Sequence, residues 1–215
     1  MEKKLRLGFL ASGRGSNLQA ILQACRDGRL RAIPAIVISN NEDSGALALA
    51  GREALPACHL SGKTHPDPAA LDEAIVAVLL KHNVDLVVLA GYMKRIGPVM
   101  LRTYRHRVIN IHPALLPQHG GKGMYGLAVH ESVIKSGAKE TGATVHLVEG
   151  EYDSGLILAQ RRVPVHRDDT AATLAARVLA TEHILYVDVL RDIIEGAIRL
   201  PEQESASPGR LHDGT

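Results

Sequence analysis

The sequence predicts an α/β protein with an open, mostly parallel twisted sheet and helices on both faces. Two observations favour this class. In the first ninety residues, short apolar runs alternate with segments whose apolar residues recur at helical spacing. In the second half, two apolar runs are joined by a short acidic turn, which is typical of antiparallel strands. We therefore expect a nucleotide-binding-like N-terminal half, with antiparallel strands added in the C-terminal half.

In the N-terminal half, the predicted strands are continuous apolar runs, as expected for strands that are buried on both faces. They occupy residues 5–10, 35–39, 58–60 and 84–89. Helices with apolar residues at helical spacing are predicted between them, over residues 16–27, 46–54 and 69–81. Gly28 ends the first helix, and polar turns at residues 40–44 and 61–68 separate the later elements.

The second half predicts a strand at Val108–His112, which Pro113 ends, and a glycine-rich loop over residues 113–125. The remaining predicted elements follow the chain in order. They are a helix at 127–136, strands at 144–148 and 156–165, and a long helix at 170–198.

Composition places the chain among ordinary soluble domains. Its 215 residues are 46% hydrophobic, with a net charge of +2 and 3% aromatic residues. We expect one domain over residues 1–200 and a loosely ordered polar tail over 201–215. The near-neutral charge and the scarce aromatic residues argue against a nucleic-acid partner, and no apolar run reaches the about 18 residues of a membrane span. Two cysteines, Cys25 and Cys58, fit free thiols in the cytoplasm.

A glycine-rich turn follows the first predicted strand and opens the first helix. Gly13 and Gly15 let the backbone approach an anion, and the helix N-terminus favours negative charge. Leu18 stands where the dinucleotide fingerprint has its third glycine. The turn alone is equally compatible with phosphate binding and with a tight turn capped by Ser16 or Asn17.

The strand Val108–His112 carries the strongest chemical signal. Strand period places Asn110 and His112 on one face, at the sheet edge where ligands bind in open α/β folds. An asparagine can donate to an oxyanion, and a histidine can transfer a proton near neutral pH. Asp153, on the acidic turn, could raise the pKa of His112 if the fold brings them together. The alternative is a hydrogen-bonded core pair with no ligand.

The other histidines predict no metal site. His65, His130 and His166 form no pair spaced i, i+4, so surface or structural roles are expected for them.

Taken together, these motifs resemble the phosphoribosylglycinamide formyltransferases, also called glycinamide ribonucleotide transformylases. The likeness runs from about residue 5 to residue 194 and rests on strings that occur in the same order as in that family. They are SGRGSNLQA from Ser12, LAGYM from Leu89, NIHPALLP from Asn110, TGATVH from Thr141 and DSG from Asp153.

The resemblance implies a role for each matching position. Asn110, His112 and Asp153 would form the catalytic set, with a protonated His112 stabilising the oxyanion beside Asn110. Gly15, Ser16 and Asn17 would hold the substrate phosphate, and Glu182 would contact its ribose or glycinamide portion. The pterin would be enclosed by two segments together with Asn110. These are Met93, Lys94, Arg95 and Ile96, and the turn of Glu149, Gly150, Glu151, Tyr152 and Asp153.

Three places depart from the family pattern. Pro68 stands where many members have a basic residue that meets the folate tail, and Lys63 is the nearest base upstream. Lys94 and Arg95 stand where many members have one basic and one apolar residue. The segment of residues 120–125 also differs from the commoner form of its loop.

The implied activity is formyl transfer from 10-formyltetrahydrofolate to the amine of phosphoribosylglycinamide in purine (IMP) synthesis, by one formyltransferase domain over residues 1–200. The folate is a co-substrate, no metal is expected, and the enzyme would be a monomer or homodimer in the cytoplasm. Formyltetrahydrofolate hydrolase and methionyl-tRNA formyltransferase share the catalytic string, but each usually carries an extra domain for which we expect no room here. A non-catalytic phosphate-binding protein would use the glycine turn but leave Asn110, His112 and Asp153 without a role.

Overall fold

The structure is a computed structural model that describes residues 4–202, and the predicted tail from 203 onward lies outside the described residues. One sheet has the strand order β3-β2-β1-β4-β5-β6-β7. Its strands are β1 (Leu5–Ala11), β2 (Ala32–Ser39), β3 (Ala57–His59), β4 (Leu86–Leu89), β5 (Val108–His112), β6 (Glu140–Leu147) and β7 (Ile157–Pro164). Strands β1 to β5 pair in parallel, whereas β6 and β7 are antiparallel to their neighbours. The predicted fold class is therefore confirmed.

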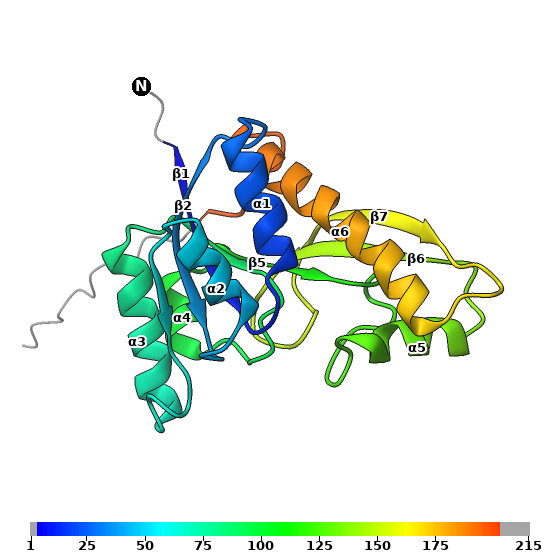
Figure 1. Cartoon of the computed structure of the whole chain (residues 1–215), viewed down its shortest axis with the longest axis horizontal. Helices are drawn as coiled ribbons and strands as arrows, with labels where there is room; N and C mark the ends of the chain where they lie inside the picture. Colours follow the sequence, from blue (N-terminus) through cyan, green and yellow to red (C-terminus); the bar gives the residue numbers. More distant parts are fainter. Residues whose placement is uncertain (1–3, 203–215) are drawn as a thin grey trace, which may run out of the picture.

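Helices cover both faces of the sheet (Figure 1). They are α1 (Ser16–Arg26), α2 (Gly45–Arg52), α3 (Pro68–Lys81), α4 (Pro98–Thr103), α5 (Leu127–Lys135) and α6 (Ala171–Ile194). Helices α1, α2 and α6 pack in one hydrophobic core, and α3 and α4 pack in a second core. Strand β4 lies between them, because Leu86 and Val88 belong to the first core while Val87 and Leu89 belong to the second. An apolar run without polar alternation is what burial on both faces requires.

A smaller core attaches α5 to the antiparallel end of the sheet. It joins Val133 of α5 and Val163 of β7 to Leu174 and Val178 of α6. Figure 1 shows α5, in green, next to the N-terminal end of the long gold-to-orange helix α6, on which it packs. The C-terminal half of the molecule therefore forms a second wall facing the ends of the parallel strands.

The sheet has a topological switch point between β1 and β4, since the chain leaves β1 for β2 and later returns to the other side of β1. Ligands bind at such points in open α/β sheets. The loops that follow the two strands are joined, because the Ser12 amide donates to the Gly91 carbonyl and the Met93 amide donates to the Ser12 hydroxyl. The buried Tyr186 hydroxyl of α6 lies 3.1 Å from the carbonyls of both Leu89 and Ile109, which fixes α6 across β4 and β5.

The largest differences between the structure and the prediction are at three elements. Helix α4 was not predicted, and the carboxylate of Asp72 on α3 accepts the Val99 and Met100 amides at its start. Strand β6 begins at Glu140, four residues before the predicted start, with Gly142 so close to the Arg161 carbonyl that a Cβ would not fit. Helix α6 ends at Ile194, before Gly196, which has φ +76°.

Candidate active site

A cavity of about 700 Å³ opens where the ends of the parallel strands face α5 and α6. Its lining draws on the loops after β1, β4 and β5, the turn after β6, and both helices. Residues of the candidate site in this lining are Asn17, Met93, Lys94, Arg95, Ile96, Asn110, His112, Gly150, Glu151, Tyr152, Asp153 and Glu182. Gly15, Ser16 and Glu149 are not among the lining residues. The fold thus brings most of the residues named from the sequence to one place.

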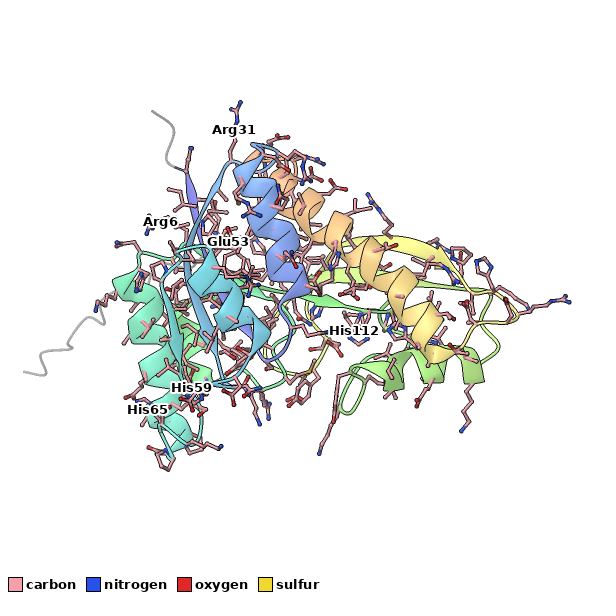
Figure 2. The ribbon with its side chains drawn as sticks, viewed as in Figure 1. Arg6, Arg31, Glu53, His59, His65 and His112 are labelled. Carbon is pink, nitrogen blue, oxygen red and sulfur yellow. The ribbon has the colours of Figure 1, made fainter. Side chains whose placement is uncertain are left out.

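Asp153 lies between two buried histidines. Its Oδ2 atom is 3.5 Å from His112 Nδ1, and its Oδ1 atom is 3.6 Å from His146 Nε2. The Gly121 amide donates to Asp153 Oδ2 over 2.9 Å, and Asp153 itself has φ +55° at the acidic turn. Figure 2 labels His112 in the interior, far from His59 and His65 near α3. The carboxylate that follows His112 by a long stretch of sequence is therefore its neighbour in space.

Asn110 and His146 face each other because β5 and β6 pair antiparallel with these two residues in register. Asn110 Nδ2 is 3.2 Å from His146 Nε2, and His146 Nδ1 is 2.8 Å from the Leu147 carbonyl. A carbonyl only accepts, so His146 Nδ1 carries a proton and a neutral ring accepts at Nε2 from the Asn110 amide. One N–H of Asn110 is then occupied and the other remains for a ligand.

Burial controls the charge of His112. It lowers the pKa of the imidazole below its usual value, and the Asp153 charge and the His119 carbonyl oppose this only in part. The charge of Asp153 does raise the pKa of His112, as expected. Burial lowers that pKa by more, so the net shift is downward. That direction favours a neutral His112 in the resting protein, whereas the sequence analysis expects a protonated one. Burial raises the pKa of Asp153, but its polar neighbours, the Gly121 amide among them, together lower it more, so the net shift is downward and Asp153 is ionised.

No side chain caps the start of α1. Gly15 is the N-cap with φ 77°, and no side chain caps the helix, so the alternative of a cap by Ser16 or Asn17 is not what the structure has. The first backbone bond of the helix runs from the Gln19 amide to the Gly15 carbonyl, which leaves the preceding amides outside the helical ladder. Such an N-terminus favours an anion.

Asn17 and Glu182 form a buried polar pair on the wall of the cavity. Asn17 Nδ2 donates to Glu182 Oε2 over 2.9 Å, and both side chains are buried. Burial raises the pKa of Glu182, and the bond from Asn17 opposes that shift. Asn17 Oδ1 is buried without a partner. A buried polar atom without a partner is costly, and this one belongs to a residue that lines the cavity.

The candidate folate wall is more exposed. Arg95 pairs with Glu151 over 3.1 Å, with both side chains largely exposed, so the pair adds little stability. Glu149 instead binds His106 Nδ1 at 3.1 Å, which accounts for its place outside the lining. Met93 and Tyr152 are large exposed side chains on the same wall. They form an apolar rim that suits an aromatic ligand.

Sequence reasoning missed several residues of the cavity. Arg14, Lys122, Tyr125, His130 and His146 all line it. His130 is buried with Nδ1 unpartnered, so the surface role considered for it is wrong. The register between β5 and β6 places His146 opposite Asn110, and no local signal in the sequence gives that register or marks Lys122 or Tyr125.

Within residues 4–202, no group of three or more histidine, cysteine, aspartate or glutamate side chains is arranged to hold a metal ion. Among the helices of the same range, none combines the length and the apolar character needed to cross a membrane.

Comparison with known proteins places the chain in a family. A family model described as formyl transferase matches residues 5–190, so the chain belongs to the formyl transferase family. It is 41% identical to phosphoribosylglycinamide formyltransferase, chloroplastic, of Arabidopsis thaliana, over 93% of this chain and 69% of that protein. It is 35% identical to phosphoribosylglycinamide formyltransferase of Haemophilus influenzae, over 95% and 94% of the two chains. The crystal structure of glycinamide ribonucleotide transformylase 1 from Symbiobacterium toebii superposes with a TM-score of 0.86 at 39% identity, covering 93% and 92%.

Proposed function

We propose that this chain transfers the formyl group of 10-formyltetrahydrofolate to the amine of 5-phosphoribosylglycinamide, a step of de novo purine (IMP) synthesis. The observation that carries the proposal is the convergence of Asn110, His112 and Asp153 on a cavity that also includes Asn17 and Glu182. A cavity of about 700 Å³ has the size of a small-molecule site. The names of the bacterial and plant relatives support the same reaction.

In the proposed mechanism, the neutral amine attacks the formyl carbon, a new C–N bond forms, and the formyl oxygen becomes an oxyanion. The N–H of Asn110 that His146 does not occupy donates to that oxyanion. His112 starts neutral, accepts the amine proton at Nδ1, and passes it to the folate nitrogen as the old C–N bond breaks. Asp153 stabilises the imidazolium between these two transfers, because its carboxylate is 3.5 Å away.

The substrate phosphate is proposed to bind at the start of α1. Gly15, Ser16 and Asn17 present backbone amides there, and the helix dipole favours the negative charge. Glu182, held by Asn17, is proposed to contact the ribose or glycinamide portion. This arrangement would place the amine between the phosphate site and the catalytic residues.

The pterin is proposed to bind against the apolar rim. Met93, Lys94, Arg95 and Ile96 would contact one side, and residues 149–153 together with Asn110 would contact the other. We also propose a cytoplasmic monomer or homodimer with one domain over residues 1–200, since Cys25 and Cys58 are free thiols and one chain supplies all the proposed site residues.

The test is a deformylation assay with 10-formyltetrahydrofolate, run with and without phosphoribosylglycinamide. Release of tetrahydrofolate should require the ribonucleotide, and formylated product should appear in equal amount. Asn110→Ala should lower kcat by about 10²–10³-fold, the usual cost of an oxyanion donor, without lowering the melting temperature steeply. Release that ignores the ribonucleotide would indicate a hydrolase and contradict the proposal, as would transfer only to methionyl-tRNA.

A further inference from the structure

His119 connects the catalytic histidine to helix α5. Its carbonyl oxygen is 2.8 Å from His112 Nε2, and its own Nδ1 is 2.9 Å from the Ser132 hydroxyl on α5. His119 also has φ +55°, a left-handed conformation that is uncommon for a residue other than glycine. The surrounding contacts must hold this backbone in place, and the Ser132 bond is one that reaches the His119 side chain.

The same short segment also holds the catalytic carboxylate. Two residues beyond His119, the Gly121 amide donates to Asp153 Oδ2 over 2.9 Å. The intervening Gly120 is packed closely, because a Cβ there would lie 2.4 Å from the Leu116 side chain and 3.3 Å from that of Asp153. Residues 119–121 therefore contact both members of the His112–Asp153 pair and fix one relative to the other.

The His119 carbonyl decides which nitrogen of His112 exchanges protons. A carbonyl only accepts, so His112 Nε2 carries a proton in both charge states. The nitrogen that gains and loses a proton is then Nδ1, which faces Asp153 at 3.5 Å. If the ring took the other tautomer, it would lose the carbonyl contact and direct the exchanging nitrogen away from the carboxylate.

We propose that His119, anchored by Ser132, is a positioning residue that holds His112 in the tautomer with the proton on Nε2. The proposal deepens the formyl-transfer mechanism above and rests on it for its effect on catalysis. Ser132 acts on His119, His119 acts on His112, and neither side chain needs to touch the substrate. The other ionisable groups facing His112 are Asp153 from the turn, His146 from β6 and His130 from α5.

The test compares wild type with Ser132→Ala, Ser132→Thr and His119→Asn. Asparagine tolerates the left-handed backbone of position 119 but is too short to reach Ser132 as histidine does. Ser136→Ala is the matched control, since that hydroxyl lies at the C-terminal end of the same helix and donates to the Val133 carbonyl rather than to His119. Nitrogen NMR of the His112 ring reports tautomer and pKa in the free protein, and steady-state kinetics reports kcat and both KM values.

We expect Ser132→Ala and His119→Asn to give a mixture of His112 tautomers and a lower His112 pKa, because the carbonyl bond favours the charged ring. The value of kcat should fall about tenfold, part of the roughly 10²–10⁴-fold that proton transfer contributes. Both KM values should stay within about twofold, since binding residues are untouched. Ser132→Thr should restore the wild-type tautomer, and Ser136→Ala should leave it unchanged.

A wild-type tautomer and pKa in folded Ser132→Ala and His119→Asn would overturn the proposal, as would an equal change in Ser136→Ala. If Ser132→Ala does not fold, His119→Asn alone decides the same question. The tautomer is measured without substrate, so it separates the two proposals. A wild type that transfers no formyl group would refute the function, while the NMR comparison would still support or refute the positioning of His112.

Discussion

The Asn110 amide and the His146 ring face each other across β5 and β6, with Asn110 Nδ2 3.2 Å from His146 Nε2. Because His146 Nδ1 donates to the Leu147 carbonyl, the neutral ring offers only Nε2 as an acceptor. The bond therefore sets the rotation of the Asn110 amide and the direction of its second N–H. A donor aimed before the reaction begins costs no reorganisation when negative charge develops.

Replacing His146 should weaken catalysis by releasing Asn110. We expect His146→Phe to lower kcat by up to about 10²-fold, the scale of a small misplacement of a catalytic group, with little change in KM for the ribonucleotide. His146→Gln should retain more activity, since its amide oxygen can accept from Asn110. Steady-state kinetics of the two variants, with a melting curve for each, makes the comparison. Equal activity of His146→Phe and wild type would show that Asn110 needs no orienting partner.

The sequence predicts a site residue well when its position within a single strand is enough to place its side chain. Asn110 and His112 share a face because strand period is fixed, and the end of a parallel strand is where ligands bind. His146 could not be placed in the same way, because its role depends on the register between β5 and β6. The downward shift of the His112 pKa also depends on burial by the whole fold, which no local pattern in the sequence reports.

The same distinction holds for the fold. Strands such as β4 were predictable because a strand that is buried on both faces consists of a continuous run of apolar residues. Helix α4 was not, since its start is held by Asp72 from a helix far earlier in the chain. The early start of β6 was hidden by Gly142, a residue that disfavours a strand locally and is required here by the close approach of Arg161.

A negative charge at the start of α1 should separate phosphate binding from stability. Ser16→Asp places a carboxylate where the phosphate is proposed to bind, and repulsion should raise the ribonucleotide KM about tenfold or more. The same charge interacts favourably with the helix dipole, by about 0.3–1 kcal/mol, so the free energy of unfolding should not fall. The measurements are both KM values and urea unfolding.

Gln19→Glu is the control for Ser16→Asp, because it adds the same charge to an exposed position of the same helix. It should leave the ribonucleotide KM near the wild-type value. Gly15 is a poorer probe, since a Cβ there would lie 3.0 Å from the Ala46 backbone at φ +77° and would disturb packing as well as any ligand. A ribonucleotide KM unchanged by Ser16→Asp would contradict the phosphate assignment.

Buried His130 should make stability depend on pH. Burial lowers its pKa from 6.5, so the folded state binds fewer protons than the unfolded chain. The stability linked to His130 is therefore complete above pH 6.5 and is lost as the pH falls through 6.5 toward the lower folded value. We expect the unfolding free energy of His130→Gln to fall less than that of wild type between about pH 7.5 and pH 5.5.

The comparison uses urea unfolding at several pH values, with His166→Gln as the control. His166 is exposed, so its replacement should leave the pH dependence as in wild type. Other groups that titrate in this range are present in all three proteins and cancel in the differences. An identical slope for wild type and His130→Gln would rule out a depressed pKa at His130.

Removing the charge of Asp153 should lower the pKa of His112 further. The carboxylate is 3.5 Å from His112 Nδ1 and is the largest contribution that opposes burial. Asp153→Asn keeps the size of the side chain and an oxygen for the Gly121 amide, but it no longer stabilises the imidazolium.

Activity of Asp153→Asn should fall by about 10²–10⁴-fold, while ribonucleotide affinity changes little. Glu73→Gln removes the charge of an exposed carboxylate on α3 that does not line the cavity, and it should retain near wild-type activity. NMR titration of His112 together with kcat decides the outcome. A His112 pKa that stays fixed or rises in Asp153→Asn would mean that the carboxylate serves the reaction through the shape of the turn rather than through its charge.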